Sequence, residues 1–335
     1  MTPPADHPAI PARRIGVLLI NLGTPDAAEP RAVRRYLAEF LSDRRVVEIS
    51  PLIWQPILRG AVLTTRPKKS AHAYAQVWSE AGSPLAAITR AQAEALVGAW
   101  GEEVLVDWAM RYGRPAIGDR LQAMKDAGCE RILLAPLYPH YCAATTATAN
   151  DRAFAKLATM RWQPAIRTLP PYYDSPAYIN ALRDSVEESL ATLDFTPDAL
   201  LASFHGMPQR TLELGDPYHC HCRKTARLLA EASGRDFITT FQSRFGRAKW
   251  LEPATDTTLA ALPAQGVKKV ALVAPGFSAD CVETLEELSL RGRETFLAAG
   301  GTDFAVLPCL NASATGVAML RRVITRELEG WLAPA

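Results

Sequence analysis

The sequence lacks several features that would settle its class at once. Its 335 residues include six cysteines, too few for a disulfide framework and typical of reduced, cytosolic thiols. No apolar run approaches the roughly 20 residues that span a bilayer. Residues 1–12 are polar and Pro-rich, without a basic start and an apolar stretch, so we expect no signal peptide. These absences predict a cytoplasmic protein.

Two further absences exclude classes of function. The formal net charge is only +2, and no basic stripe with interleaved aromatic residues is present, so we expect no nucleic-acid partner. No strand-to-turn segment carries a full Gly-x-Gly-x-x-Gly pattern. The sequence therefore predicts neither a nicotinamide nor a flavin site.

An internal repeat is the most informative feature that the sequence does have. Residues 17–25 and 200–208 are apolar runs that both end in x-Gly-x-Pro, a pattern typical of a buried strand that enters a sharp turn. Residues 133–138 and 272–277 echo each other further along. Because the length suits two domains, we predict an α/β fold. It consists of two similar Rossmann-like lobes with parallel sheets and a cleft between them.

The predicted elements alternate between strands and amphipathic helices. We expect a first lobe over residues 14–165 and a second over residues 166–330, with the crossing near residues 163–173. Predicted strands lie near residues 16–21, 104–110, 131–137, 166–168, 199–204, 236–240, 269–274 and 303–307. Predicted helices lie near residues 31–41, 83–100, 115–127, 176–193, 223–232 and 282–299, and a terminal helix over 314–330 crosses back onto the first lobe.

The second lobe differs from the first at the strand ends, where ligands bind in open α/β sheets. His205 ends a buried strand at the position where the first lobe has Leu22, so we expect its imidazole at the rim of the cleft. The alternative is a core histidine. Glu283 and Glu287 follow another strand and are four residues apart, on one helix face. They predict a proton or cation relay, although acids also favour an ordinary helix start.

Other segments suit a large, partly apolar ligand. Arg111 and Tyr112 follow a predicted strand and suit an anionic or aromatic ligand, unless they are a surface Arg beside a packed Tyr. The loop over residues 242–250, with Trp250, either lines the cleft or covers the surface. Residues 50–65 form a strongly apolar segment that a basic collar follows, composed of Arg66, Lys68 and Lys69. We interpret this segment as a lip for an apolar ligand and a membrane surface, the alternative being a core helix.

Cys220-His221-Cys222 has the outline of a soft-metal site. It is incomplete, because four ligands are needed. Cys142 could approach it in space, or these cysteines are near one another by chance.

Together these residues resemble the ferrochelatases, of the bacterial type, and the resemblance runs from about residue 14 to about residue 328. It is carried by motifs that are specific only in combination: Asn21-Leu22-Gly23-Thr24-Pro25, Gly82-Ser83-Pro84-Leu85, Arg111-Tyr112, Tyr138-Pro139, Phe204-His205-Gly206-Met207-Pro208, Gly215-Asp216-Pro217-Tyr218, Gln242-Ser243, Trp250-Leu251-x-Pro253 and Asp280-Cys281-Val282-Glu283-Thr284-Leu285.

The resemblance implies a chelatase fold and a lyase that inserts Fe2+ into protoporphyrin IX to give protohaem. His205 and Glu283 would be the facing catalytic pair, and with Glu287 they would handle the metal. The residues expected to bind porphyrin are Leu22, Ser83, Arg111, Tyr112, Trp250 and Phe277. The lip would contact the inner membrane peripherally, and its apolar character favours protoporphyrin over coproporphyrin. A chelatase for another tetrapyrrole and a non-catalytic porphyrin carrier remain alternatives.

The sequence departs from the family pattern at three places. Cys281 stands where many relatives carry a second histidine, and Arg291 stands where some continue the acidic ladder. Some relatives bind a [2Fe-2S] cluster through cysteines near the C-terminus, and residues 316–335 contain none. If a cluster is bound, Cys142, Cys220 and Cys222 are the best candidates for its ligands.

Overall fold

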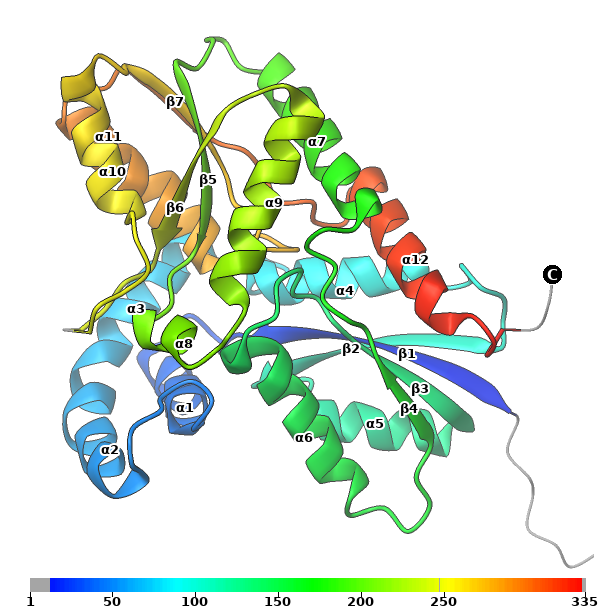
Figure 1. Cartoon of the computed structure of the whole chain (residues 1–335). Helices are drawn as coiled ribbons and strands as arrows, with labels where there is room; N and C mark the ends of the chain where they lie inside the picture. Colours follow the sequence, from blue (N-terminus) through cyan, green and yellow to red (C-terminus); the bar gives the residue numbers. More distant parts are fainter. Residues whose placement is uncertain (1–12, 247, 333–335) are drawn as a thin grey trace, which may run out of the picture.

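The computed structural model describes residues 13–246 and 248–332, which form two parallel four-stranded sheets (Figure 1). The first sheet has the order β2-β1-β3-β4 and the second the order β6-β5-β7-β8. The strands are β1 (Arg14–Gly23), β2 (Val104–Tyr112), β3 (Cys129–Pro136), β4 (Ala165–Thr168), β5 (Ala199–His205), β6 (Phe237–Gln242), β7 (Lys269–Val273) and β8 (Asp303–Val306). Residues 1–12, where we expect no signal peptide, lie outside the described part.

The two sheets have the same topology, which confirms the predicted repeat. Each strand of the second sheet occupies the place of the strand four positions earlier in the first, and all six ladders are parallel. The central strand β1 is buried on both faces, with Val17, Leu18, Leu19 and Ile20 fully buried. A continuous apolar run of this kind is what a parallel sheet covered by helices requires.

One predicted strand belongs to the other lobe. We placed residues 166–168 in the second lobe, but β4 pairs with β3 at the edge of the first sheet. The reason is the helix α6 (Thr148–Leu157), which forms the crossover between β3 and β4 and returns the chain to the same sheet as a βαβ unit. The first sheet therefore extends to Thr168, beyond the predicted boundary at residue 165.

Helices cover the sheets and carry the lip. The α-helices are α1 (Pro30–Ser42), α2 (Pro51–Ile57), α3 (Leu63–Val77), α4 (Pro84–Leu96), α5 (Ile117–Asp126), α6, α7 (Pro176–Ala191), α8 (Gln209–Glu213), α9 (Tyr218–Ser233), α10 (Thr255–Ala261), α11 (Arg293–Ala298) and α12 (Ala314–Leu328). Three π-helical segments are η1 (Leu58–Val62), η2 (Ala143–Ala147) and η4 (Glu283–Gly292), and η3 (Leu262–Gln265) is a 3₁₀ turn. In the described part, no helix has the length and apolarity that crossing a bilayer needs.

The predicted helix over residues 282–299 is in fact two segments. Its first part, η4, is π-helical, and only α11 is an α-helix. π-Helical turns are rare and concentrate at functional sites. The sequence pattern could not show this, because residues four apart lie along one side of both helix types.

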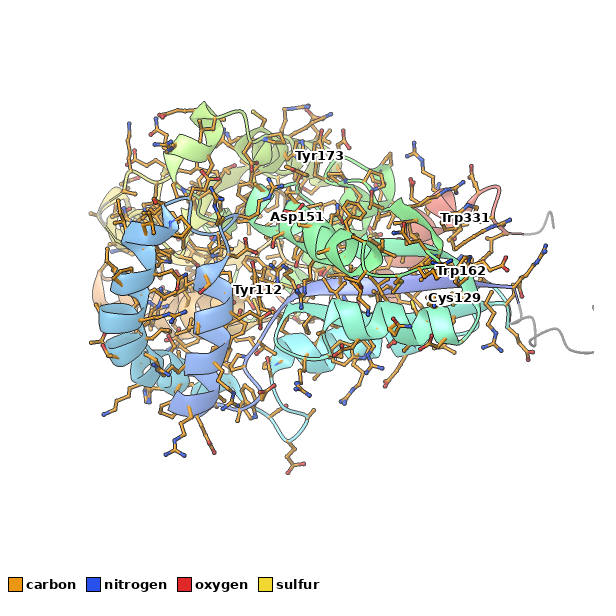
Figure 2. All side chains as sticks on the ribbon, turned by 90° about the horizontal axis from the view of Figure 1, so that it is seen from below. Tyr112, Cys129, Asp151, Trp162, Tyr173 and Trp331 are labelled. Carbon is orange, nitrogen blue, oxygen red and sulfur yellow. The ribbon has the colours of Figure 1, made fainter. Side chains whose placement is uncertain are left out.

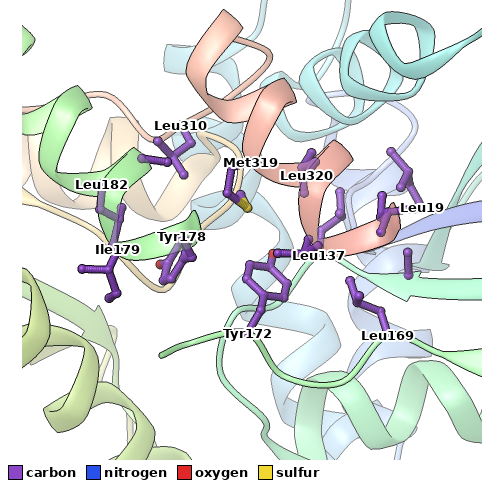
Figure 3. Close-up of a cluster of buried hydrophobic side chains, with 14 of the residues drawn as sticks. Leu19, Leu137, Leu169, Tyr172, Tyr178, Ile179, Leu182, Leu310, Met319 and Leu320 are labelled. Carbon is purple, nitrogen blue, oxygen red and sulfur yellow. The ribbon is translucent and has the colours of Figure 1, made fainter. Parts of the chain in front are cut away.

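One large buried cluster contains side chains of both lobes. Figure 3 shows Leu19, Leu137 and Leu169 of the first lobe in one buried cluster with side chains of α7 and α12. The terminal helix α12 crosses back to the first lobe, as predicted: Trp100 Nε1 donates to Thr325 Oγ1 at 2.8 Å, and Arg321 donates to the carbonyl of Ala99 at 3.1 Å. The lobes are therefore packed against each other and not merely linked.

A second cluster lies under the lip. Tyr36 of α1, Tyr74 of α3 and Tyr112 at the end of β2 are buried together with Leu58 and Leu63. Figure 2 shows Tyr112 beside the blue helices that follow β1. Val282 of the second lobe packs against the same cluster, so this is a further contact between the lobes.

Candidate active site

The predicted catalytic residues lie at the carboxyl edge of the second sheet. His205 is the last residue of β5, and Glu283 begins η4 after the loop that follows β7. Since β5 and β7 are neighbours at the point where the strand order reverses, their carboxyl ends flank the position where open α/β sheets bind ligands. Both side chains are half-buried, so neither is sealed in the core.

The local hydrogen bonds define which nitrogen of His205 can act as a base. His205 Nδ1 lies 2.7 Å from the carbonyl oxygen of Gly206. A carbonyl only accepts hydrogen bonds, so Nδ1 carries the proton and Nε2 of the neutral ring holds the lone pair. Nε2 has no hydrogen-bond partner among the described residues. The ring of Phe277 lies 6.4 Å from the imidazole, centroid to centroid.

The glycine of each x-Gly-x-Pro turn is required by a close neighbouring strand. A Cβ on Gly206 would lie 2.5 Å from the carbonyl oxygen of Gln242, and one on Gly23 would lie 1.9 Å from that of Tyr112. Gly23 also has a φ of +119°, which only glycine adopts readily. The repeat therefore preserves the same tight exit from the central strand of each sheet.

Gln242 connects His205 with Glu283. It ends β6 and pairs with His205 across the ladder of β5 and β6. Its Nε2 donates to the backbone carbonyl of Glu283 at 3.3 Å, and its Oε1 accepts from Ser203 Oγ at 2.7 Å. The sequence indicated Gln242 as the first residue of the loop over residues 242–250 and as part of a family motif, but nothing in its spacing predicted this link.

The charge of Glu283 acts on first-lobe side chains that the sequence did not predict. Burial raises the pKa of both Tyr36 and Tyr74, and the negative charge of Glu283 raises them further. Burial lowers the pKa of Arg66, an effect that the tyrosines and Glu283 partly offset. Arg66, which we placed in the basic collar, is partly buried, and its guanidinium carbon lies 5.2 Å from the ring centroid of Phe245. No sequence pattern distinguishes these residues from an ordinary helix core.

Glu287 is held by the protein more firmly than a mobile relay would be. Its carboxylate accepts from Ser243 N at 2.7 Å and from Ser243 Oγ at 2.6 Å. Arg291 lies 3.9 Å away and donates from Nε to both oxygens of Glu286, at 3.0 and 3.1 Å. At Arg291, where we predicted that the series of acids stops, the guanidinium thus pairs with both Glu286 and Glu287.

The predicted porphyrin-binding residues divide into two groups. Leu22, Phe277 and Arg111 keep some exposed surface. Ser83, Tyr112 and Trp250 are buried; Ser83 accepts from Thr24 Oγ1 at 2.8 Å, and Trp250 Nε1 donates to the carbonyl of Phe245 at 3.0 Å. In this structure the three buried residues therefore have little surface with which to contact a ligand.

Arg111 and Tyr112 belong to one polar cluster. The guanidinium of Arg111 donates to Asp43 and to Thr148, and the hydroxyl of Tyr112 donates to Asp43 at 2.9 Å. Tyr112 is fully buried. Arg111 borders a polar cavity of about 540 Å³ together with Asp43, Thr148 and Arg152, so its positive charge lies beside open space although it is already paired.

The lip is exposed along one side and anchored along the other. Leu52 is 88% and Ile53 is 60% exposed, and Ile57 is also exposed. Leu58 and Leu63 are buried in the cluster beneath. In Figure 1, α2 lies at the lower left, away from both sheets. The segment is therefore an apolar surface, as we predicted, and not a core helix.

The cysteines do not fit an iron–sulfur cluster. Such a cluster is held by four ligands, usually thiolates. Cys220 is exposed, whereas Cys222 and Cys142 are buried, because residues two apart on α9 point to different sides. Burial raises the pKa of both buried thiols, which opposes thiolate formation. In residues 13–246 and 248–332, no three His, Cys, Asp or Glu side chains gather into a group that could hold a metal ion.

The structure describes His205, Glu283 and Glu287, and these three side chains do not gather into a group that could hold a metal ion. Cys281, at the position of the second histidine, is a buried thiol whose pKa burial and the adjacent Glu283 raise. The residues that we expected to handle the metal therefore do not enclose an ion in this structure.

Comparisons with known proteins agree with this architecture. The ferrochelatase family profile matches residues 14–328. The ferrochelatase of Agrobacterium fabrum is 54% identical over 336 residues, and that of Rhizobium meliloti is 55% identical over 334; each alignment covers 98% of both chains.

Two solved structures share the fold at low sequence identity. SirB from Bacillus subtilis with Fe3+ has a TM-score of 0.54 at 12% identity and covers 95% of this chain and 98% of its own. The sirohydrochlorin chelatase SirB from Bacillus subtilis subspecies spizizenii, in complex with cobalt, has a TM-score of 0.51 at 12% identity, with 95% and 97% coverage. They support the two-lobed chelatase architecture. From the family match and the identity over nearly the whole length, the chain belongs to the ferrochelatase family.

Proposed function

We propose that this chain inserts Fe2+ into protoporphyrin IX to give protohaem, with His205 as the base on one face of the macrocycle. The observation that carries the proposal concerns the positions of His205 and Glu283: His205 ends β5 with an unpartnered Nε2, and Gln242, its partner across the ladder, donates to the backbone carbonyl of Glu283. Family membership makes a porphyrin metal-chelating enzyme of the lyase class the function that this site serves.

The chemistry explains why a base is needed. A free-base porphyrin holds two N–H protons in a planar ring, and Fe2+ enters only as these protons leave. The protein must grip the macrocycle, bend it so that nitrogen lone pairs point out of the plane, and accept the protons. Binding energy at the apolar periphery can drive that distortion. An imidazole that is neutral near pH 7 suits the proton transfer.

Glu283 has the role of passing protons onward or holding Fe2+ before transfer, since imidazole and carboxylate both bind iron. Its negative charge acts on Tyr36, Tyr74 and Arg66 of the opposite lobe. Glu287 is tied to Ser243, so we assign it a minor share of the relay and a support role for the loop after β6.

We also propose a cytoplasmic enzyme that associates peripherally with the inner membrane through the lip. The exposed apolar residues of α2 are followed by the exposed cations Arg59, Lys68 and Lys69. Apolar side chains that enter the interface, together with cations that contact anionic headgroups, are the usual requirements for such binding. A poorly soluble porphyrin would then reach the site from the membrane, which favours protoporphyrin over the more polar coproporphyrin.

One assay tests the reaction and its alternatives. The full chain is mixed anaerobically with Fe2+ and either protoporphyrin IX or coproporphyrin III, and the Soret band is followed. We expect an Fe2+-dependent shift that is faster with protoporphyrin. Binding of porphyrin without that shift would identify a carrier, and faster turnover of coproporphyrin would reverse the substrate assignment.

A further inference from the structure

The motif Gly215-Asp216-Pro217-Tyr218 has no role in the proposed reaction, yet its last residue contacts the proposed base. Tyr218, the first residue of α9, is buried, and its hydroxyl donates to the backbone carbonyl of His205 at 3.0 Å. A hydrogen bond from a buried hydroxyl is a strong local restraint, because breaking it costs the free energy of leaving a buried polar group unsatisfied.

This hydrogen bond acts on the peptide unit that orients the imidazole. The carbonyl of His205 and the N–H of Gly206 belong to one planar peptide. Tyr218 holds the carbonyl, and the N–H donates to the carbonyl of Gln242 at 2.7 Å. The next carbonyl, that of Gly206, accepts from His205 Nδ1. If this peptide turned, the acceptor that fixes the imidazole would turn with it.

Tyr218 is itself fixed from both lobes. The carboxylate of Asp216 accepts from the N–H of Tyr218 at 3.0 Å with one oxygen, and from the N–H of Ala143 at 2.8 Å with the other. Ala143 begins η2 in the first lobe. The ring of His140, from the same lobe, packs edge-on at 6.1 Å from that of Tyr218.

We propose that Tyr218 is a positioning residue for the reaction: anchored to the first lobe through Asp216, it fixes the His205–Gly206 peptide and so aims Nε2 of His205. This inference rests on the proposed role of His205 as the base. Tyr218 itself touches neither porphyrin nor iron in this role. A displacement of about 1 Å at a reacting group can cost up to 10²-fold in rate, so a single remote hydroxyl can matter.

The substitution Tyr218→Phe removes only the hydroxyl. Tyr172→Phe is a matched control, because the hydroxyl of Tyr172 is equally buried and has no hydrogen-bond partner among the described residues. With Fe2+ and protoporphyrin IX, we expect kcat of Tyr218→Phe to fall about five- to tenfold while KM changes less than twofold. Tyr172→Phe should behave like the wild type.

A spectroscopic measurement separates aiming from simple packing. Nitrogen-15 NMR of the six histidines reports the tautomer of each ring, and His205→Ala identifies the His205 signal by its loss. In the wild type we expect the neutral ring of His205 to carry its proton on Nδ1. In Tyr218→Phe, but not in Tyr172→Phe, that signal should move toward a mixture of tautomers.

The outcomes separate the role of His205 as the base from the role of Tyr218 in positioning it. If His205→Ala keeps its activity, the proposed base is wrong. If His205→Ala is inactive but Tyr218→Phe matches Tyr172→Phe in kcat and in the His205 signal, the positioning role is wrong and the base stands. Should Tyr218→Phe not fold, Asp216→Asn loosens Tyr218 without removing its hydroxyl. It should also lower kcat with little change in KM, and an unchanged kcat would overturn the role of Tyr218.

Discussion

Gln242 donates from its side-chain amide to the backbone carbonyl of Glu283 at 3.3 Å, from the position that pairs with His205 across two strands. It is 2% exposed, and a buried amide keeps its orientation because every partner it loses costs free energy. Gln242 therefore ties the backbone at the start of η4, where Glu283 lies, to the sheet edge that carries the proposed base. Sites built on strands hold their geometry more tightly than sites on loops.

Removing the imidazole tests the base directly. We expect His205→Ala to lose ~10²-fold or more of its insertion rate while it still folds and quenches porphyrin fluorescence on binding. His72→Ala is a suitable control, because His72 is exposed on α3. Near wild-type turnover in His205→Ala would refute the role.

Glu283 and Glu287 should contribute unequally to the insertion rate. We expect Glu283→Gln to slow insertion far more than Glu287→Gln, because Glu287 is already bound by Ser243 and lies near Arg291. Initial rates with saturating protoporphyrin IX and a range of Fe2+ concentrations measure both. Equal effects would favour an ordinary charged helix over a relay.

Asp43 should make stability depend on pH. Burial alone would raise the pKa of its carboxyl, but hydrogen bonds from Thr148, Arg45 N and Tyr112, with the charge of Arg111, together hold the pKa below its usual range. The unfolded chain has the ordinary value of about 3.9. The stabilisation is complete above that value and is lost as the pH falls through the lower folded value.

Replacing Asp43 with Asn should therefore lower the free energy of unfolding by about 2–3 kcal/mol near pH 7. The difference in free energy of unfolding between variant and wild type should shrink below about pH 4. Urea titrations at several pH values measure this difference. Asp26→Asn, in an exposed pair with Arg35, should change stability by less than about 1 kcal/mol, and a gap for Asp43→Asn that stays constant with pH would contradict the assignment.

The lip should bind anionic vesicles. Burying one leucine side chain contributes about 1.5–3 kcal/mol, so Leu52→Glu should weaken binding to phosphatidylglycerol-containing vesicles at least about tenfold in a sedimentation assay. High salt should weaken the wild type as well, by screening the basic residues. Val97→Glu alters an exposed apolar residue outside the lip and should leave binding unchanged. Equal losses in both variants would remove the lip from this role.

The sequence predicted the fold well because the signals were local. Both central strands are largely apolar runs; β1 ends at Gly23 and β5 is followed by Gly206, and the neighbouring strand requires both glycines. That pattern also placed His205 at a strand end. Membership of β4 in the first sheet was missed, since a four-residue strand carries no mark of the sheet that it joins.

The rest of the site could not be predicted because it depends on contacts between distant segments. Tyr36 and Tyr74 precede Glu283 by more than 200 positions, yet the charge of Glu283 raises the pKa of both. We placed Tyr218 ahead of the predicted helix over residues 223–232 and named it only as part of a family motif, so its hydrogen bond to His205 could not be foreseen. The Cys220 and Cys222 pair suggested a ligand set because spacing along the chain does not show that a helix separates the two side chains.

The shared core behind the sheets carries a consequence for ancestry. If the matching halves arose by duplication, a founder with one half would have exposed the apolar face that α7, α12 and both central strands now close together. A second copy of the same half could have covered that face, as the other lobe does here.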